Sequence, residues 1–226
     1  MLLTSLRCIC TFTYNSPQLI YECSIPTFMY DILFQHFYQY VSISKEEFEV
    51  CESLFRYKKF RKHQYILQNR DVSRYETFIL SGCTRTYEVD EDGQEHIIQF
   101  GLETWWVGDL HSFLTNSPSR LNIDCLEDTE VLQISRTEME TLYEKLPKLE
   151  RFFRILMQKA YVAAMDRIYS NLSKPAPERY QEFIQKYPLI EQRVPNHQIA
   201  SYLGITPQSL SRIRSQSVPQ KKAGRG

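Results

Sequence analysis

The sequence predicts an α+β protein with an N-terminal β-roll, then one long helix, then a C-terminal helix-turn-helix. Two changes of periodicity carry this prediction. Between residues 60 and 134 the pattern has a period of two and Tyr, Thr, Val, Ile and Phe are frequent, whereas on both sides apolar residues recur every three or four positions. The third observation is segment 195–214, in which two short helical patterns meet at a glycine.

Residues 29–57, which precede the roll, have a helical pattern. One face of it carries Phe34, Phe37, Tyr38 and Val41. Ser44 with Glu47 three residues later resembles a capping box, the motif that satisfies two free backbone N–H groups at a helix start. Further apolar residues follow this box at helical spacing, namely Phe48, Cys51, Leu54 and Phe55.

The roll is predicted from four β-like segments, 65–67, 75–89, 95–107 and 120–134. Turn signals separate them, and Asp92-Gly93 is typical of a tight hairpin between two strands. Several short strands at near-regular spacing favour a small barrel, sandwich or jelly roll.

After the roll, residues 136–146 form a predicted short helix, and Pro147 begins a long helix that reaches about residue 172. The long helix carries one apolar stripe: Leu149, Phe152, Phe153, Leu156, Ala160, Ala163, Ala164 and Ile168. Two interpretations of this stripe remain open. In the first, the stripe pairs with the same helix of a second subunit. In the second, it packs on the β-domain of its own chain. Both hold if they use different flanks of the long helix.

Lys174-Pro175-Ala176-Pro177 interrupts the long helix and is the predicted hinge, after which a helix over 178–186 ends before Pro188. The predicted parts are an N-terminal extension (1–28), a β-roll sensor domain (29–146), a dimerisation helix (147–173), a helix-turn-helix domain (174–216) and a basic tail (217–226). The extension has few charges, and we expect it to be disordered, or to precede a native start at Met29.

The helix-turn-helix prediction depends on residues that agree with one geometry. Gly204 can adopt the left-handed conformation that ends a helix. Thr206 is a good cap for the second helix, and Pro207 suits its first position, where a missing N–H costs nothing. Apolar side chains for packing the two helices together are Ile199, Leu203, Leu210 and Ile213.

The outward face of the second helix is polar and contains no acid: Gln208, Ser209, Ser211, Arg212, Arg214 and Gln216. Gln and Arg side chains form paired hydrogen bonds with purine edges, and hydroxyl groups suit phosphates. An ordinary helical hairpin is the alternative, but it does not account for the missing acids. The sequence therefore predicts that this helix lies in the major groove of DNA.

The charge of the chain is divided unevenly, although its net value over 226 residues is zero. Residues 174–226 contain nine Lys and Arg against three Asp and Glu, a balance of +6, and residues 1–173 have the opposite balance of −6. An acidic body with a basic end fits a sensor domain joined to a DNA-reading domain.

Six cysteines occur, without a Cys-x-x-Cys pair, and reduced thiols are the expected state. Cys8, Cys10, Cys23 and Cys125 match an iron–sulfur site in number but not in spacing. The N-terminus has no pattern of a secretory signal, and no apolar run reaches the length of a membrane span. We therefore expect a cytoplasmic protein without a metal cofactor or membrane contact.

Two other classes of function are alternatives. A metal-dependent cupin enzyme would need clustered histidines, whereas His63, His96 and His111 stand alone. A sensor that acts through protein contacts, with a weak helix-turn-helix, is the second alternative. No nucleophile elbow, phosphate loop or paired-carboxylate motif is present, so we expect no enzymatic activity.

Over residues 45–216 the chain resembles the family of cyclic-AMP receptor protein and FNR, which are bacterial transcription regulators. The resemblance is carried by Gly108-Asp109-Leu110, by the strand at 130–135 and by 199–214. Segment 105–109 and the end of the chain soon after the second helix resemble the branch found widely in Bacteroidetes-type bacteria. The resemblance implies an effector pocket in a cyclic-nucleotide-binding-like roll, a dimer seam in the long helix, and a second reader helix that enters DNA.

Members of the family that bind cyclic nucleotides carry Gly-Glu-Leu and, later, Arg-Ser/Thr-Ala. Here Gly108-Asp109-Leu110 has a shorter acid, and Ser119-Arg120 displaces the arginine by one position. A shift of one residue in a strand turns a side chain to the opposite face. Either a remodelled loop lets Arg120 reach the pocket, or Asp109 only caps a helix and Arg120 is solvated. These departures favour another small anion, or no ligand, over a cyclic nucleotide.

The resemblance also implies roles on DNA. A homodimer through residues 148–172 would present two reader helices about 34 Å apart, matching a pseudo-palindromic operator. Arg212 is expected to read guanine and Gln208 adenine, with Pro207 limited to packing. The expected phosphate contacts are Asn196, Thr206 and Ser209. Ser211 is a further polar residue on the DNA-facing side of the second helix. Arg214 faces phosphate or solvent, and RNA polymerase is a candidate partner.

Overall fold

The computed structural model describes residues 27–217, and within them two four-stranded antiparallel sheets form a β-roll. One sheet has the order β1-β8-β3-β6, with β1 (Arg56–Phe60), β8 (Thr129–Ser135), β3 (Tyr75–Ser81) and β6 (Trp106–Val107). The other has the order β2-β7-β4-β5, with β2 (Tyr65–Leu67), β7 (Asn122–Cys125), β4 (Thr84–Val89) and β5 (Glu95–Gly101). The α+β prediction with a roll, a long helix and C-terminal helices is confirmed.

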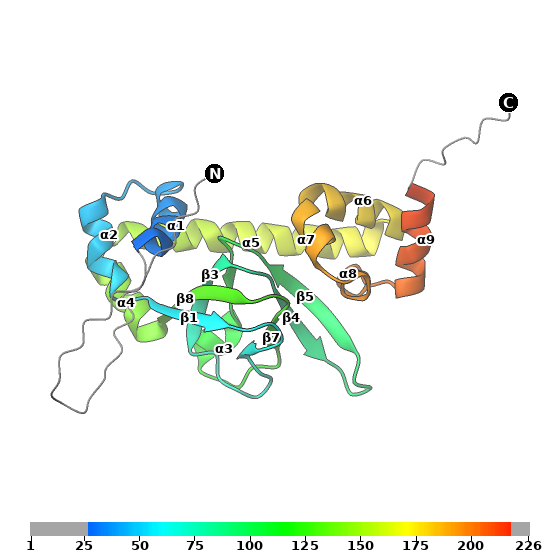
Figure 1. Cartoon of the computed structure of the whole chain (residues 1–226), viewed down its shortest axis with the longest axis horizontal. Helices are drawn as coiled ribbons and strands as arrows, with labels where there is room; N and C mark the ends of the chain where they lie inside the picture. The colour runs from blue at the N-terminus through cyan, green and yellow to red at the C-terminus, as the bar shows by residue number, and fades with distance from the viewer. Residues whose placement is uncertain (1–26, 218–226) are drawn as a thin grey trace, which may run out of the picture.

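The long helix α5 runs along the roll and joins two groups of shorter helices (Figure 1). At its start lie α1 (Thr27–Tyr38), α2 (Lys45–Glu52) and α4 (Arg136–Lys145), and α5 itself spans Lys148–Ser173. At its other end lie α6 (Ala176–Lys186), α7 (Pro188–Arg193), α8 (Asn196–Tyr202) and α9 (Pro207–Ser217). The short helix α3 (Leu110–Thr115) belongs to the roll. No helix among residues 27–217 is both long and apolar enough to cross a membrane.

One local prediction needs correction. The helical pattern over 29–57 forms α1 and α2, but its last residues, 56 and 57, already belong to strand β1. The capping box of Ser44 and Glu47 starts α2 as expected. The helix α6 ends at Lys186, before Pro188 as predicted, and Pro188 then occupies the first turn of α7, where its missing N–H is not needed.

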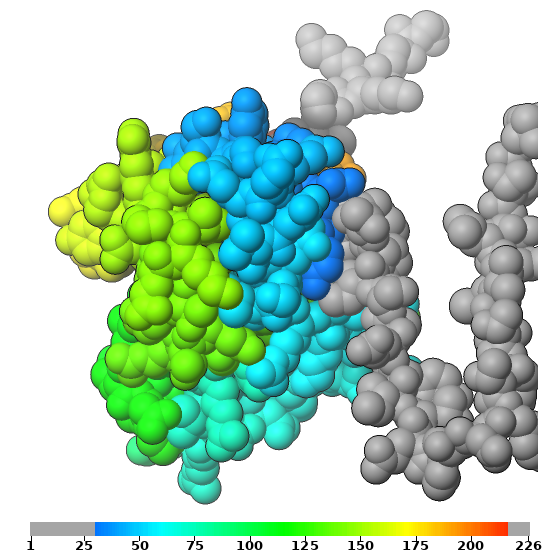
Figure 2. All heavy atoms as spheres, turned by 90° about the vertical axis from the view of Figure 1, so that its left-hand side faces the viewer, coloured from blue at the N-terminus to red at the C-terminus, as the bar shows by residue number. Residues whose placement is uncertain are grey.

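An aromatic core joins the first half of α5 to the roll. Phe152 packs on Phe37 of α1 with ring centroids 4.7 Å apart, and Phe153 packs on Trp106 of β6 at 5.0 Å. Seen end-on, α1 and α2 form one continuous surface with α4 and the start of α5 (Figure 2). The stripe of α5 up to Phe153 is therefore used within the chain, whereas Tyr161 is 67% exposed and Leu172 is 82% exposed.

A second core joins the C-terminal helices to the roll. It contains Phe100 and Ile97 of β5 together with Phe183 of α6 and Ile199 of α8. Tyr202, at the end of α8, lies 5.5 Å from Phe100 between ring centroids. The helix-turn-helix thus packs against β5 through α8, not through α9. The N-terminal extension with Cys8, Cys10 and Cys23 and all but the first residue of the basic tail lie outside the described residues.

Candidate nucleic-acid interface and effector site

The turn between α8 and α9 has the geometry that its sequence predicts. Gly204 has a φ of +65°, the left-handed region that is strained for residues with a Cβ. The Thr206 hydroxyl oxygen accepts a hydrogen bond from the Ser209 backbone N–H at 3.1 Å and so caps α9. The packing face is buried, with Ile199, Leu203, Leu210 and Ile213 all at 7% exposure or less.

The polar face of α9 is directed away from the roll. Pro207, Gln208, Ser211 and Arg212 are exposed, and Ser209 is half-buried. Arg212 has no ion-pair partner among residues 27–217. The main contacts of the helix-turn-helix with β5 come from α8, and α9 lies at the far end of the molecule, where a second macromolecule can reach its exposed face (Figure 1).

Arg214 has a different role from the two that the sequence left open. Its guanidinium forms an ion pair with Glu191 of α7 and donates to the side-chain oxygen of Asn196 in α8. Arg214 therefore holds α9 against its neighbours. Asn196 is exposed, and its side-chain oxygen is used in this contact with Arg214.

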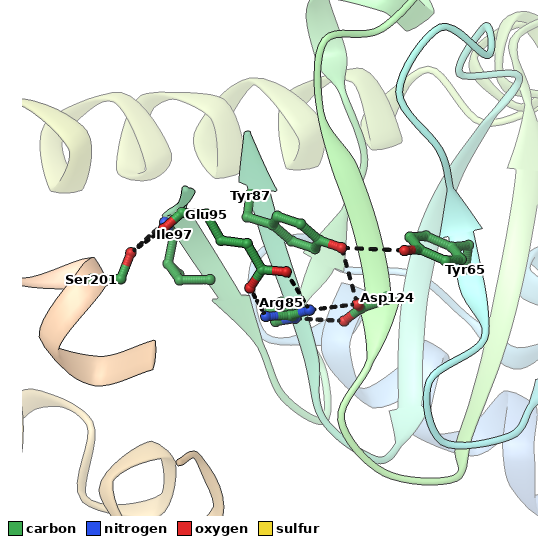
Figure 3. Close-up of polar contacts among 7 residues, drawn as sticks. All are labelled: Tyr65, Arg85, Tyr87, Glu95, Ile97, Asp124 and Ser201. Carbon is green, nitrogen blue, oxygen red and sulfur yellow. Dashed lines mark hydrogen bonds and ion pairs between the residues drawn. The ribbon is translucent and has the colours of Figure 1, made fainter. Parts of the chain in front are cut away.

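Ser201 of α8 connects the helix-turn-helix to the edge of the roll (Figure 3). Its hydroxyl accepts from the Ile97 backbone N–H at 3.0 Å and donates to the Glu95 carbonyl at 2.8 Å. Arg167 of α5 donates to the Ile98 carbonyl of the same strand. Because β5 is an edge strand, these side chains replace the missing neighbour strand.

Arg193, the last residue of α7, makes a second connection. It forms ion pairs with Glu103 in the β5–β6 loop at 2.8 Å and with Glu127 in the β7–β8 turn at 2.6 Å. Burial raises the pKa of Glu103, but the hydrogen bonds from Arg193 outweigh this and hold the pKa below its ordinary value. No local sequence pattern indicates this cluster, because its three residues come from segments far apart in the chain.

Beside Ser201 lies a polar cluster that ties three strands of the roll together (Figure 3). Arg85 of β4 donates to both carboxylate oxygens of Asp124 in β7, at 2.8 and 2.9 Å, and also pairs with Glu95 of β5. Burial alone would lower the pKa of Arg85, but these hydrogen bonds hold it above its ordinary value. Tyr87 donates to the same Asp124 carboxylate at 3.3 Å, so this cluster is satisfied internally.

The effector cassette is closed by its own side chains. Asp109 accepts from the Ser112 backbone N–H at 3.2 Å and caps α3. Ser119, which occupies the place of the family's arginine, donates to the other Asp109 oxygen at 2.6 Å and is 3% exposed. Arg120 is exposed at the surface, and Leu110 is 42% exposed. The structure thus brings Gly108, Asp109 and Ser119 together and leaves Arg120 and Leu110 outside.

Glu76 of β3, which sequence reasoning missed, lies directly behind the cassette. A Cβ at Gly108 would approach both Glu76 carboxylate oxygens to 2.9 Å, so the glycine is needed to make room for this side chain. Burial, and then the charge of Asp109, raise the pKa of Glu76 to about 8. Two acids and no buried arginine meet at this point, so the residues do not fit a cyclic phosphate.

The described thiols and histidines form no metal site. Burial raises the pKa of Cys51 and Cys83 to about 12 and that of Cys125 to about 11, so these thiols are protonated. His96 bonds to Asp90 at 2.6 Å in the exposed hairpin. Residues 27–217 contain no group of three His, Cys, Asp or Glu side chains placed to hold a metal ion.

Comparisons with known proteins match the roll to a domain family and most of the chain to bacterial regulators. Residues 57–145 match the family model of the cyclic nucleotide-binding domain. Regulatory protein HlyX of Actinobacillus pleuropneumoniae is 26% identical over 186 residues, covering 76% of each chain. Transcriptional activator protein anr of Pseudomonas aeruginosa is 23% identical over 188 residues, covering 76% of this chain and 75% of its own. The chain is thus similar in sequence to FNR-type regulators over three quarters of its length, and its roll matches the cyclic nucleotide-binding domain.

Solved structures of CRP/FNR folds agree in architecture. FixK2 from Bradyrhizobium japonicum has a TM-score of 0.62 at 21% identity, over 72% of this chain and 83% of its own. The c-di-GMP-responsive regulator CLP of Xanthomonas campestris has a TM-score of 0.64 at 11% identity, over 76% of this chain and 91% of its own. At these identities the likeness establishes the CRP/FNR fold and leaves the ligand of this chain to be argued from its own residues.

Proposed function

We propose that this chain is a DNA-binding transcription regulator that acts as a homodimer. The observation that carries the proposal is the exposed, acid-free polar face of α9, presented at the end of α5 and free of the roll. Related CRP/FNR chains that match over three quarters of its length are named as transcriptional activators or regulators. Because the DNA that a bacterial regulator binds lies in the cytoplasm, we assign the protein to the cytoplasm.

The second half of α5 is the dimer seam of this proposal. Exposed residues recur there at steps of three or four: Met157, Tyr161, Ala164, Ile168 and Leu172. This spacing is that of a two-helix seam, in which side chains of one helix fill spaces between those of the other. Leu149, Phe152 and Phe153 are buried in the chain's own core. The proposed seam therefore uses the second half of α5 and shares only Ala164 and Ile168 with the predicted stripe.

On DNA, Arg212 is assigned to a guanine edge and Gln208 to an adenine edge. Thr206, Ser209 and Asn196 are assigned to the phosphate backbone, and Pro207 to van der Waals contact. Ser211 is a further polar residue of the DNA-facing side. Pairing through α5 would set the two α9 helices about one DNA turn apart. Contact with RNA polymerase follows only if the protein activates transcription from such a site.

Selection of bound fragments from random double-stranded DNA tests this function. We expect enriched sequences with two inverted half-sites whose centres lie about 10 base pairs apart. Sedimentation of the protein with and without the Leu172→Glu substitution supplies the dimer measurement, with the exposed Gln192→Glu as a control of equal charge change. Random output sequences from a dimeric wild-type protein would contradict the proposal.

A further inference from the structure

A cavity of about 370 Å³ lies in the roll between its two sheets, on the side of the edge strands β1 and β2. Its size falls at the lower end of the range for small-molecule sites, roughly 300–1,000 Å³. No residue of α5 lines the cavity, and of the cassette residues only Gly108 does. It is therefore a separate space from the closed cassette of Asp109 and Ser119.

Two cations without acid partners line this cavity. Lys58 of β1 and Arg74 of the β2–β3 loop form no ion pair with any residue in 27–217. The Lys58 ammonium instead lies 4.7 Å from the centroid of the Phe60 ring. Asp71 is the single acid of the lining, so the lining carries a positive balance. Both cationic side chains are exposed, so they are free to pair with an anionic ligand that reaches the cavity from solvent.

The inner surface offers both polar and apolar contacts. Gln133 donates its amide N–H to the Thr77 hydroxyl at 3.0 Å, which fixes both side chains at the inner end while the Gln133 amide oxygen stays available. Leu67 and Ile123 from the opposite sheet supply apolar walls, and Tyr75 adds an aromatic ring. A ligand with a compact apolar or aromatic body and one acidic group matches this combination.

We propose that this cavity binds a small organic anion, a carboxylate or a phosphate monoester with an apolar body, whose charged group pairs with Lys58 and Arg74. The inference deepens the proposed function, on which it depends for its biological meaning, because a ligand here would be the effector of the regulator. The binding chemistry itself does not require DNA binding.

Phenyl phosphate, phenol and inorganic phosphate are suitable probes, added to the full chain and followed by calorimetric titration. We expect phenyl phosphate to bind most tightly, because only it combines the ring with the charge. Lys58→Glu and Arg74→Glu should each weaken it by about tenfold or more, the effect of losing a charge-assisted hydrogen bond. Lys62→Glu, an exposed substitution of equal charge change outside the lining, should bind as the wild type does.

Several outcomes would overturn the assignment. They are no binding of phenyl phosphate by the wild type at millimolar concentration, equal binding by Lys58→Glu, and loss of binding in Arg120→Glu, which would move the site to the cassette. A melting curve for each variant separates unfolding from loss of the site. Titration of operator DNA on the same samples separates this inference from the proposed function, since either can fail while the other holds.

Discussion

The reader helix α9 and the α3 cassette both carry short polar motifs, but their polar groups have opposite surroundings. On α9, Gln208 and Arg212 are exposed and Arg212 has no ion-pair partner in the described chain. In the cassette, Asp109 and Ser119 are buried and bonded to each other at 2.6 Å. Polar groups without partners in the chain are free to form hydrogen bonds with an external ligand, whereas groups that bond to each other stabilise the fold. The contrast is that the polar face of α9 is open to a partner, whereas the polar groups of the cassette already bond to each other.

The largest expected effect is on the pH dependence of the free energy of unfolding, through the buried Glu76 carboxyl behind the cassette. Because its folded pKa of about 8 exceeds the ordinary carboxyl value of 4.5, the folded state binds more protons between these values, and this contribution to stability is lost as pH rises. Glu76→Gln removes the ionisation. We expect wild type and variant to be similar near about pH 5, and the variant to be more stable by about 2–5 kcal/mol near about pH 9.

Urea unfolding at both pH values measures this difference. Glu91→Gln, in the exposed β4–β5 turn, is the matched control and should show no such divergence. If Glu76→Gln were less stable than the wild type at high pH, the carboxyl would have a partner that stabilises its charge, and the cassette would not be closed.

The next effect is on DNA affinity and concerns the exposed polar face of α9. Arg212→Ala should weaken operator binding by about 1–3 kcal/mol and relax specificity at one base pair. Arg214→Ala, which removes the tie to Glu191, should instead lower the melting temperature of the helix-turn-helix. Shift assays with operators mutated at single positions distinguish these results. Equal weakening of Arg212→Ala on all sequences would make this residue a phosphate contact.

A smaller effect is expected from Asp109→Ala. It removes the cap of α3 and leaves the Ser119 hydroxyl without its acceptor, so the free energy of unfolding should fall by about 1–2 kcal/mol. DNA affinity at a temperature where the variant is folded should not change. Asp92→Ala, in the exposed hairpin turn, serves as the control. Loss of ligand response with unchanged stability would instead assign Asp109 to a binding role.

The smallest expected effect is that of cyclic AMP. Since Ser119 stands in place of the phosphate-binding arginine and two acids lie beside Gly108, cyclic AMP should leave the melting temperature unchanged. The melting temperature with phenyl phosphate, the proposed ligand type of the cavity lined by Lys58 and Arg74, is the positive comparison. A clear rise in melting temperature with cyclic AMP would show that the cassette opens.

Sequence reasoning succeeded where a motif is local. Gly204, Thr206 and Pro207 determine the turn between α8 and α9 within a few residues, and the capping box of Ser44 and Glu47 determines the start of α2 in the same way. The period-two pattern was enough to predict the roll, since it requires only alternation along a strand.

It failed where a contact joins distant segments. Arg193 meets Glu103 and Glu127 from two separate turns, and Ser201 bonds to β5 about one hundred positions earlier in the chain. No spacing rule connects such residues. The displacement of Arg120 was visible in the sequence, but the burial of Glu76 behind Gly108 was not, because only the packed sheet brings β3 to the cassette.

The central claim is that α9 presents its free polar face to DNA from a paired scaffold. Titration of the wild-type protein onto a selected operator at increasing salt concentration tests it most directly. Several phosphate contacts from each subunit predict tight binding at low salt and a steep, linear fall of log affinity with log salt. An affinity that does not respond to salt, or no binding to any duplex at low ionic strength, would contradict it.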